Sequence, residues 1–279
     1  MNWSTFDDFI KKELIDDGAY NDITTNAIIE ESSKSTADII AKEDGIIAGI
    51  GIFKRVFEIF KGAEAEFTIS DGSKVKKGEI IGRVFGSTHS ILSGERTALN
   101  LMQILSGIAT TTSNLNKRLE GTGVKLLDTR KTTPGMRLLE KYAVKIGGGY
   151  NHRFGLSDGI LIKDNHIDAA YGITNAVNLA RNNSSFVRKI EVETETLDEV
   201  SEALNAKADI IMLDNMDVET IKKAVKLINK RALIEVSGNI TFENIREKAV
   251  PGVDYISSGM LTHSFNVLDI SMKNLRNEK

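Results

Sequence analysis

The sequence has 279 residues, a length that can bury a substantial hydrophobic core without disulfide or metal support. Its 36 Lys and Arg residues are nearly balanced by 39 Asp and Glu residues, which argues against a protein dominated by nucleic-acid binding. It contains no cysteine, which excludes disulfide scaffolds, thiolate metal sites, iron–sulfur clusters and thiol nucleophiles.

The N-terminal twenty residues contain early acidic side chains and no apolar segment of the kind found in secretory signals. The longest apolar runs, such as 45–53, are far shorter than the ~20 residues that span a bilayer. We therefore expect a cytoplasmic protein with no membrane partner. At about 150 residues per domain, the length predicts two domains.

Residues 35–92 are predicted to form short antiparallel strands in a sandwich-like arrangement. Apolar alternation in this region is interrupted by turn signals, including Asp71-Gly72 and Lys77-Gly78. Over 93–120 the apolar residues recur instead at helical spacing, which predicts one long helix.

From residue 123 onward, short apolar runs alternate with amphipathic helical patterns. The six runs are Val124–Leu127, Gly159–Ile162, Lys189–Val192, Ala208–Leu213, Ala232–Val236 and Val253–Ile256. The clearest helix follows the fourth run, over 217–230, with Asp217 as its cap. Strand–helix alternation predicts a parallel sheet, either doubly wound or rolled into a barrel.

Polar residues stand at or just after the carboxyl end of all six predicted strands. Barrels build their active sites from the carboxyl ends of many strands, whereas doubly wound sheets use the switch point. The pattern therefore favours a barrel, and six strands predict one that is smaller than usual or incompletely closed. The residues are Asp128–Lys131, Lys163–Asn165, Glu191 and Glu193, Asp214–Asn215, Ser237–Asn239 and Ser257–Gly259.

Residues 133–147 predict a helix, with Thr133 as the cap, Pro134 in the first turn and Gly147 at the end. Basic residues are concentrated around this helix and outnumber the two acidic ones, Glu140 and Asp158. A solvated basic surface would give the same composition, but the glycine turns and strand ends nearby favour a pocket for small anions. The basic residues are Arg130, Lys131, Arg137, Lys141, Lys145, Arg153 and Lys163.

The four histidines have no zinc-type spacing. Glu193 and Asp214, together with substrate phosphates, suit a hard cation such as Mg²⁺. The small residues at 237–239 and 257–259 could present backbone N–H groups to a phosphate, although either segment could equally be an ordinary turn.

Beyond these patterns, the chain resembles the quinolinate phosphoribosyltransferase family, also called carboxylating nicotinate-nucleotide pyrophosphorylases. The resemblance runs essentially from end to end, and its central block of forty residues is highly specific. Its motifs are DITT at 22–25, GERTALNLMQILSGIAT at 94–110, the block at 128–167, IEVE at 190–193, MLDN at 212–215, SGNI at 237–240 and ISSGMLTHS at 256–264.

The resemblance implies a pentosyltransferase that converts quinolinate and phosphoribosyl pyrophosphate to nicotinate mononucleotide, pyrophosphate and CO₂, with Mg²⁺, in de novo NAD biosynthesis. It implies an N-terminal α/β sandwich domain over 1–105, joined by the segment 264–279. It also implies an open α/β barrel over 106–263 that carries the catalytic site. Family members are homodimers, or hexamers built from dimers.

The resemblance also implies residue roles. Arg96 would reach the neighbouring subunit's active site and contact quinolinate there. Catalysis would use Lys131, Glu193 and Asp214, and Mg²⁺ would be held by Glu193 and Asp214, directly or through water. The remaining quinolinate contacts would be Arg130, His152, Arg153 and Lys163. The contacts to phosphoribosyl pyrophosphate would be Lys131, Glu193, Asp214, Ser237, Gly238, Asn239, Ser258, Gly259 and His263. Asn239 departs from the glycine that many relatives have, but its backbone N–H can still serve.

Two alternatives compete with this interpretation. One is a related phosphoribosyltransferase-like protein that acts on a different acceptor, against which the intact motifs at 130–137 and 151–156 count. The other is a non-catalytic barrel that binds phosphorylated metabolites as a regulatory module, which the complete set of acidic and basic groups disfavours.

Overall fold

The computed structural model describes residues 1–278, and it divides into two compact units. One comprises Met1–Thr111 together with the residues from Phe265 onward, and the other comprises Thr112–Ser264. The division falls a few residues from the predicted boundary after residue 105. Lys279, the last residue of the predicted segment 264–279, lies outside the described residues.

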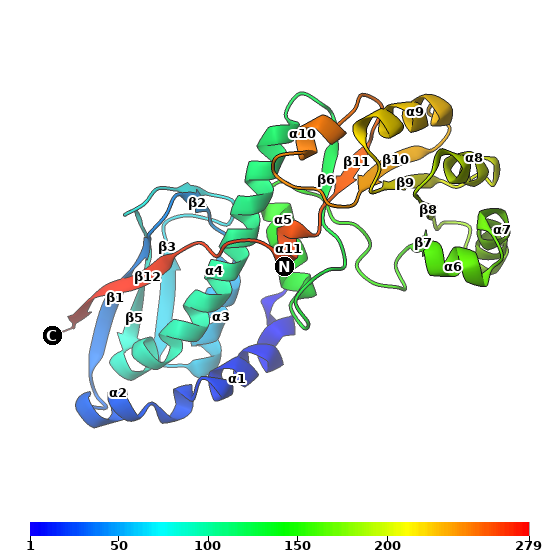
Figure 1. The fold of residues 1–279 in the computed structure, drawn as a ribbon. Helices are drawn as coiled ribbons and strands as arrows, with labels where there is room; N and C mark the ends of the chain where they lie inside the picture. Colours follow the sequence, from blue (N-terminus) through cyan, green and yellow to red (C-terminus); the bar gives the residue numbers. More distant parts are fainter. Residues whose placement is uncertain (279) are drawn as a thin grey trace. The chain divides into compact units, whose positions relative to one another are not determined.

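The first unit is built on a four-stranded antiparallel sheet in the order β12-β1-β5-β3. Residues of β1 alternate between buried and more exposed positions, so the sheet turns one face to the core. The last strand of the chain pairs with β1, with Ile39 opposite Met272, and Figure 1 shows β12 in red beside β1 in blue. The bounds are β1 Lys34–Ala41, β3 Ala63–Phe67, β5 Ile80–Ser87 and β12 Ile270–Asn277.

Helices α3, at Ile50–Phe60, and α4, at Thr88–Leu119, lie on the same side of this sheet (Figure 1). The long helix α4 was predicted, but α3 was not, because the whole of 35–92 was interpreted as strands. Phe53 and Phe57 of α3 are fully buried one helical turn apart, and this period was overlooked. The remaining elements are α1 Asp7–Asp16, α2 Ile23–Ile28 and the paired short strands β2 Gly45–Ile46 and β4 Lys74–Val75.

The second unit contains a six-stranded parallel sheet in the order β6-β11-β10-β9-β8-β7. The first strand of this unit, β6, pairs with its last strand, β11, and the strands from β11 to β7 then follow in reverse chain order. This is the cyclic order of a barrel in which the hydrogen-bonded series ends at β6 and β7, so the predicted open α/β barrel is confirmed. The strands are β6 Lys125–Leu127, β7 Ile160–Ile162, β8 Ile190–Thr194, β9 Ile210–Asp214, β10 Leu233–Ser237 and β11 Tyr255–Ser257.

Helices connect these strands, and α9 at Val218–Ile228 begins as predicted, with the Asp217 side chain accepting a hydrogen bond from Thr220 N. The predicted start of α5 was wrong. The helix spans Arg137–Ile146, and Thr133–Met136 forms a turn closed by Met136 N and Thr133 O, with Gly135 at φ +81°. Proline followed by a left-handed glycine is typical of a type II turn. The other helices are α6 Asp164–Ala169, α7 Ile173–Asn183, α8 Leu197–Asn205, α10 Ile245–Lys248 and α11 Met260–His263.

None of the helices within residues 1–278 is both long enough and apolar enough to cross a membrane.

Candidate active site

A cavity of about 790 Å³ opens at the carboxyl ends of the barrel strands. Residues that end or follow all six strands contribute to it, which is the position expected for a barrel active site. Every site residue predicted in the barrel lines this cavity: Arg130, Lys131, His152, Arg153, Lys163, Glu193, Asp214, Ser237, Gly238, Asn239, Ser258, Gly259 and His263. Arg96 belongs to the other unit, where it is exposed on α4.

The guanidinium groups of Arg130 and Arg153 both line the cavity. Arg153 donates a hydrogen bond to Gly159 O at 3.0 Å, which fixes the direction of its side chain. Burial and the nearby charge of Arg130 both lower the pKa of Arg153, although an arginine remains charged at neutral pH. A pair of planar cations suits a substrate with two carboxylates.

Lys163 follows β7 and lies next to Glu193 of β8, with which it forms an ion pair. The Lys163 side chain is 42% exposed and the Glu193 side chain 14% exposed, so the ammonium group is accessible from the cavity. The backbone N–H of Lys163 donates to His166 Nδ1 at 3.1 Å, which gives His166 a structural role at the start of α6.

On the opposite side, the loops after β10 and β11 bring small residues against polar ones. A Cβ on Gly259 would lie 2.8 Å from His263 Nε2 and 3.1 Å from Lys131 Cδ, so a side chain at this position would displace both of these side chains. The hydroxyl of Thr262 donates to Lys131 O at 2.7 Å and ties the Lys131 loop to α11. This close approach of backbone, lysine and histidine is suited to a phosphate.

Asn239 is held in the left-handed region at φ 49°, a conformation that asparagine tolerates better than most residues. Its side chain donates to Asn215 Oδ1 at 2.9 Å, and Asn215 donates to Asp214 Oδ2 at 2.7 Å. The departure from glycine at 239 therefore adds a hydrogen-bonded connection to the Asp214 carboxylate. Asn215 was not predicted as a site residue, although it follows β9 directly.

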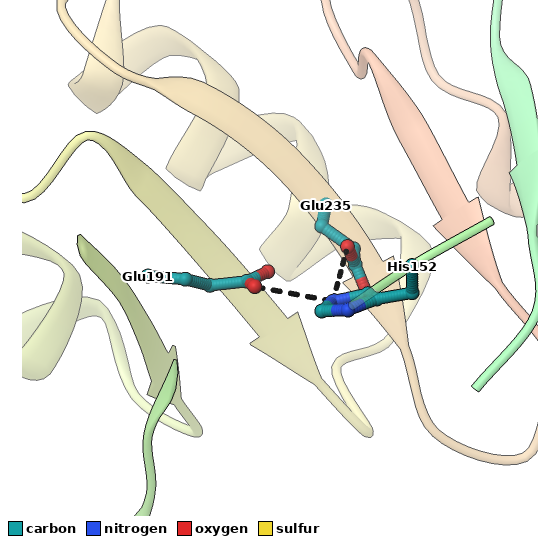
Figure 2. Close-up of side chains that lie close together, drawn as sticks. All are labelled: His152, Glu191 and Glu235. Atoms are coloured by element: carbon teal, nitrogen blue, oxygen red, sulfur yellow. Dashed lines mark ion pairs between the residues drawn. The ribbon is translucent and has the colours of Figure 1, made fainter. Parts of the chain in front are cut away.

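A cluster that the sequence did not predict lies at the edge of the cavity, which two of its members, His152 and Glu235, help to line. His152 Nε2 lies 3.1 Å from Glu191 Oε2 and 3.4 Å from Glu235 Oε2, and Figure 2 shows the ring between the two carboxylates. The glutamates are only 4% and 2% exposed. Burial raises the pKa of Glu191 to about 6. The sequence does contain a signal for Glu235, because a charged residue in the centre of a buried strand requires a charged or hydrogen-bonding partner.

The composition of this cluster would suit a metal ion, since its three ligand atoms lie within 4.8 Å of one another. However, His152 Nδ1 accepts the backbone N–H of Arg153 at 2.7 Å, so the ring proton belongs on Nε2, which then faces the carboxylates as a donor. Burial disfavours a second proton on the ring, whereas the carboxylates of Glu191 and Glu235 act in the other direction and raise the pKa of His152. Because a proton on Nδ1 would face the Arg153 N–H directly, we assign the neutral ring with the proton on Nε2.

Three of the basic residues predicted for the pocket do not line it. Lys145 is exposed on α5, and Lys141 is buried in an ion pair with Asp128. Arg137 bonds to the loops on either side of α5, to Thr132 Oγ1 and Phe154 O. The basic charge at the cavity is therefore concentrated in Arg130, Lys131, Arg153 and Lys163.

Comparison with known proteins places the chain in a family. The sequence model of the quinolinate phosphoribosyl transferase C-terminal domain matches residues 108–273, and that of the N-terminal domain matches residues 22–106. A probable carboxylating nicotinate-nucleotide pyrophosphorylase of Bacillus subtilis is 45% identical over 273 residues, covering 98% of this chain and 94% of the relative.

Two further relatives agree. A decarboxylating quinolinate phosphoribosyltransferase of Nicotiana tabacum is 44% identical, covering 92% of this chain and 79% of the relative. The crystal structure of NadC from Streptococcus pyogenes is 44% identical, with a TM-score of 0.96 over 100% of this chain and 99% of the other.

Proposed function

The chain belongs to the quinolinate phosphoribosyltransferase family, and we propose that it transfers the phosphoribosyl group of phosphoribosyl pyrophosphate to quinolinate. The products are nicotinate mononucleotide, pyrophosphate and CO₂, a step of de novo NAD biosynthesis. The observation that carries the proposal is a single cavity with cations for a dicarboxylate, small residues for a phosphate, and carboxylates between them. We place the reaction in the cytoplasm, as the sequence predicts.

Quinolinate would be bound by Arg130, Arg153 and Lys163, with His152 beside them. Each of the two guanidinium groups can bind a carboxylate by donating a pair of hydrogen bonds to it, and the Lys163 ammonium group adds a point charge. This arrangement would hold the pyridine nitrogen in a fixed direction toward the anomeric carbon of the sugar, and orientation of this kind is a large part of catalysis by two-substrate enzymes.

Phosphoribosyl pyrophosphate would bind on the other side of the cavity. The segments Ser237–Asn239 and Ser258–Gly259, with His263, would take the 5′-phosphate. Lys131 would contact the pyrophosphate. As pyrophosphate departs, positive charge develops at the anomeric carbon, and the carboxylates of Glu193 and Asp214 would stabilise it electrostatically. After the ring nitrogen becomes a pyridinium, it stabilises the electron pair left on the adjacent carbon when CO₂ leaves, and that carbon then takes up a proton from solvent to give nicotinate mononucleotide.

Glu193 and Asp214 also fit a magnesium ion. They come from neighbouring strands β8 and β9, and carboxylate oxygens combined with substrate phosphates and water are the ligands this ion prefers. Bound Mg²⁺ would neutralise charge on the leaving pyrophosphate.

We further propose a homodimer, or a hexamer assembled from dimers, in which Arg96 of one protomer reaches the active site of its neighbour. Its exposure on α4 leaves the guanidinium group available for such a contact.

The test is turnover with phosphoribosyl pyrophosphate, Mg²⁺ and one of two acceptors. Quinolinate should react, and nicotinate should show a kcat/KM lower by at least about 100-fold. Nicotinate has a single carboxylate, so the cations that bind the second carboxylate of quinolinate would be left unpaired. Equal or better turnover of nicotinate would favour the alternative, a related transferase with a different acceptor.

A further inference from the structure

A buried ion pair does not line the cavity but bonds to the backbone of His152, which does. Asp128 follows β6 and is fully buried, and its side chain accepts from the ammonium group of Lys141 on α5, whose side chain is 4% exposed. Buried ion pairs seldom improve stability over an apolar pair of the same size. The presence of this pair therefore calls for a function other than stability.

Further hydrogen bonds of the pair all go to one short segment. Asp128 Oδ1 accepts His152 N at 2.9 Å, and Asp128 Oδ2 accepts Asn151 Nδ2 at 2.5 Å. Lys141 Nζ also donates to His152 O at 3.1 Å, and Asn151 Nδ2 donates to Lys141 O at 2.9 Å. Both the N–H and the C=O of His152 are thus fixed by the pair. Burial raises the pKa of Asp128, but its three N–H donors require the ionised carboxylate.

The two arginines proposed to bind quinolinate are close in the sequence to this segment and to Asp128. Arg153 follows His152, and Arg130 lies two residues after Asp128. Both residues line the same cavity, and the positive charge of Arg130 lowers the pKa of Arg153, after the larger effect of burial. Like charges at short range repel, so something in the fold must hold the two segments together.

Helix α5 reinforces the same two segments from its first turn. Arg137 Nε donates to Thr132 Oγ1 at 2.9 Å, and Arg137 Nη1 donates to Phe154 O at 3.3 Å. The carboxylate of Glu140, which is fully buried, accepts Thr133 N at 3.1 Å. The helix thus braces the loops before and after it.

We propose that the Asp128–Lys141 ion pair is a positioning device that holds Arg130 and Arg153 at the separation a dicarboxylate requires before the substrate arrives. Asp128 and Lys141 touch no substrate, and their effect passes through the backbone of His152 and the strand end at 128. The inference rests on the proposed function, because it takes quinolinate as the dicarboxylate. Preorganisation of this kind should lower the KM for quinolinate and leave the sugar-phosphate side of the cavity unaffected.

The decisive variant is the double substitution Asp128→Asn with Lys141→Met. A single Lys141→Met change would leave a buried carboxylate without its counter-charge and could unfold the protein, whereas the double variant is neutral and of similar size. We expect its KM for quinolinate to rise about tenfold or more, with the KM for phosphoribosyl pyrophosphate changed by less than about twofold. Lys145→Met, an exposed change on the same helix, is the matched control and should behave as the wild type.

Asn151→Ala gives a second measurement if the double variant does not fold. It removes one hydrogen bond to Asp128 and keeps the ion pair, so the KM for quinolinate should rise by a smaller factor with the same selectivity. An unchanged KM for quinolinate in either folded variant would overturn the proposal. An equal rise in the KM values for both substrates would also overturn it, because general destabilisation of the protein would give that result. A wild-type protein without quinolinate turnover would instead refute the proposed function.

Discussion

Lys163 and Glu193 form an ion pair across neighbouring strands, although the sequence assigns one to quinolinate and the other to the sugar. Both residues line the cavity. An incoming carboxylate of quinolinate would share the Lys163 ammonium group with Glu193, so binding of the acceptor and the electrostatics of the anomeric carbon are connected through one contact.

Replacement of Lys163 by Met should lower kcat/KM for quinolinate by at least about 100-fold, because a charged hydrogen bond to substrate is lost and Glu193 loses its partner. The protein should remain folded, since the side chain is partly exposed. Steady-state kinetics and circular dichroism measure the two effects, and Arg130→Ala should behave similarly. Lys226→Met, on the exposed face of α9, is the control. Wild-type-like efficiency in both site variants would show that Lys163 and Arg130 do not bind quinolinate.

Gly259→Ala should raise the KM for phosphoribosyl pyrophosphate without a comparable change for quinolinate. The added methyl group would meet His263 at 2.8 Å and Lys131 at 3.1 Å, and would displace the side chains assigned to the phosphates. Gly155→Ala is the matched control, because a Cβ there has no neighbour within 4 Å. A Gly259 variant with unchanged phosphoribosyl pyrophosphate kinetics would contradict the placement of the phosphate at this loop.

The barrel was predictable because its strands are short apolar runs with polar residues at one end, a pattern that survives without tertiary information. The elements that were missed carry conflicting local signals. Ile50–Phe60 is rich in residues that favour strands, yet Phe53 and Phe57 pack as one face of a helix. Pro134 suits the first turn of a helix, but Gly135 after it favours the turn that the chain adopts.

The lining of the cavity was predictable where a polar residue stands at a strand end, as for Glu193, Asp214 and Ser237. It was not predictable where the function depends on a partner distant in the sequence. Lys141 is a basic residue of the kind that binds anions, and only the structure shows that it is buried in an ion pair with Asp128 and does not line the cavity. His152 was predicted to lie near quinolinate, but the buried carboxylates beside its ring, Glu191 and Glu235, are about forty and about eighty residues away in the sequence.

The ion pair of Asp38 with Arg276 should make the anchoring of the last strand sensitive to acid. Hydrogen bonds from Arg276 and Asn274 lower the pKa of Asp38 to about 2 from an ordinary value of 3.8. A depressed folded-state pKa contributes stability that is complete above pH 3.8 and is lost as the pH falls through about 2.

Asp38→Asn should therefore lower Tm at pH 6, and the difference from the wild type should shrink as the pH approaches 2. Thermal unfolding at several pH values measures this, and Lys76→Met, which breaks an exposed ion pair with Asp44, is a comparison for surface electrostatics. A Tm difference that is independent of pH would show that the carboxylate charge at Asp38 does not hold the strand.

The proposed exchange of Arg96 between protomers has a direct test by complementation. Arg96→Ala and Lys131→Ala should each be nearly inactive alone, because each lacks a contact to substrate. In a mixed dimer, one site has lost both groups and the other has both intact. Mixing the two variants after subunit exchange should therefore restore up to about a quarter of the wild-type activity per protomer, assuming random pairing of dimers. No recovery in a dimer shown to exchange would place Arg96 outside the neighbouring site.

The central claim is the coupling of ribosyl transfer to decarboxylation at one cavity. The most direct measurement follows quinolinate labelled in the carboxyl group next to the ring nitrogen, with phosphoribosyl pyrophosphate and Mg²⁺, and quantifies all three products. The account predicts nicotinate mononucleotide, pyrophosphate and labelled CO₂ in equal amounts, with the reaction stopped by a chelator and restored by added Mg²⁺. No consumption of quinolinate by the folded protein, or pyrophosphate release without labelled CO₂, would contradict it.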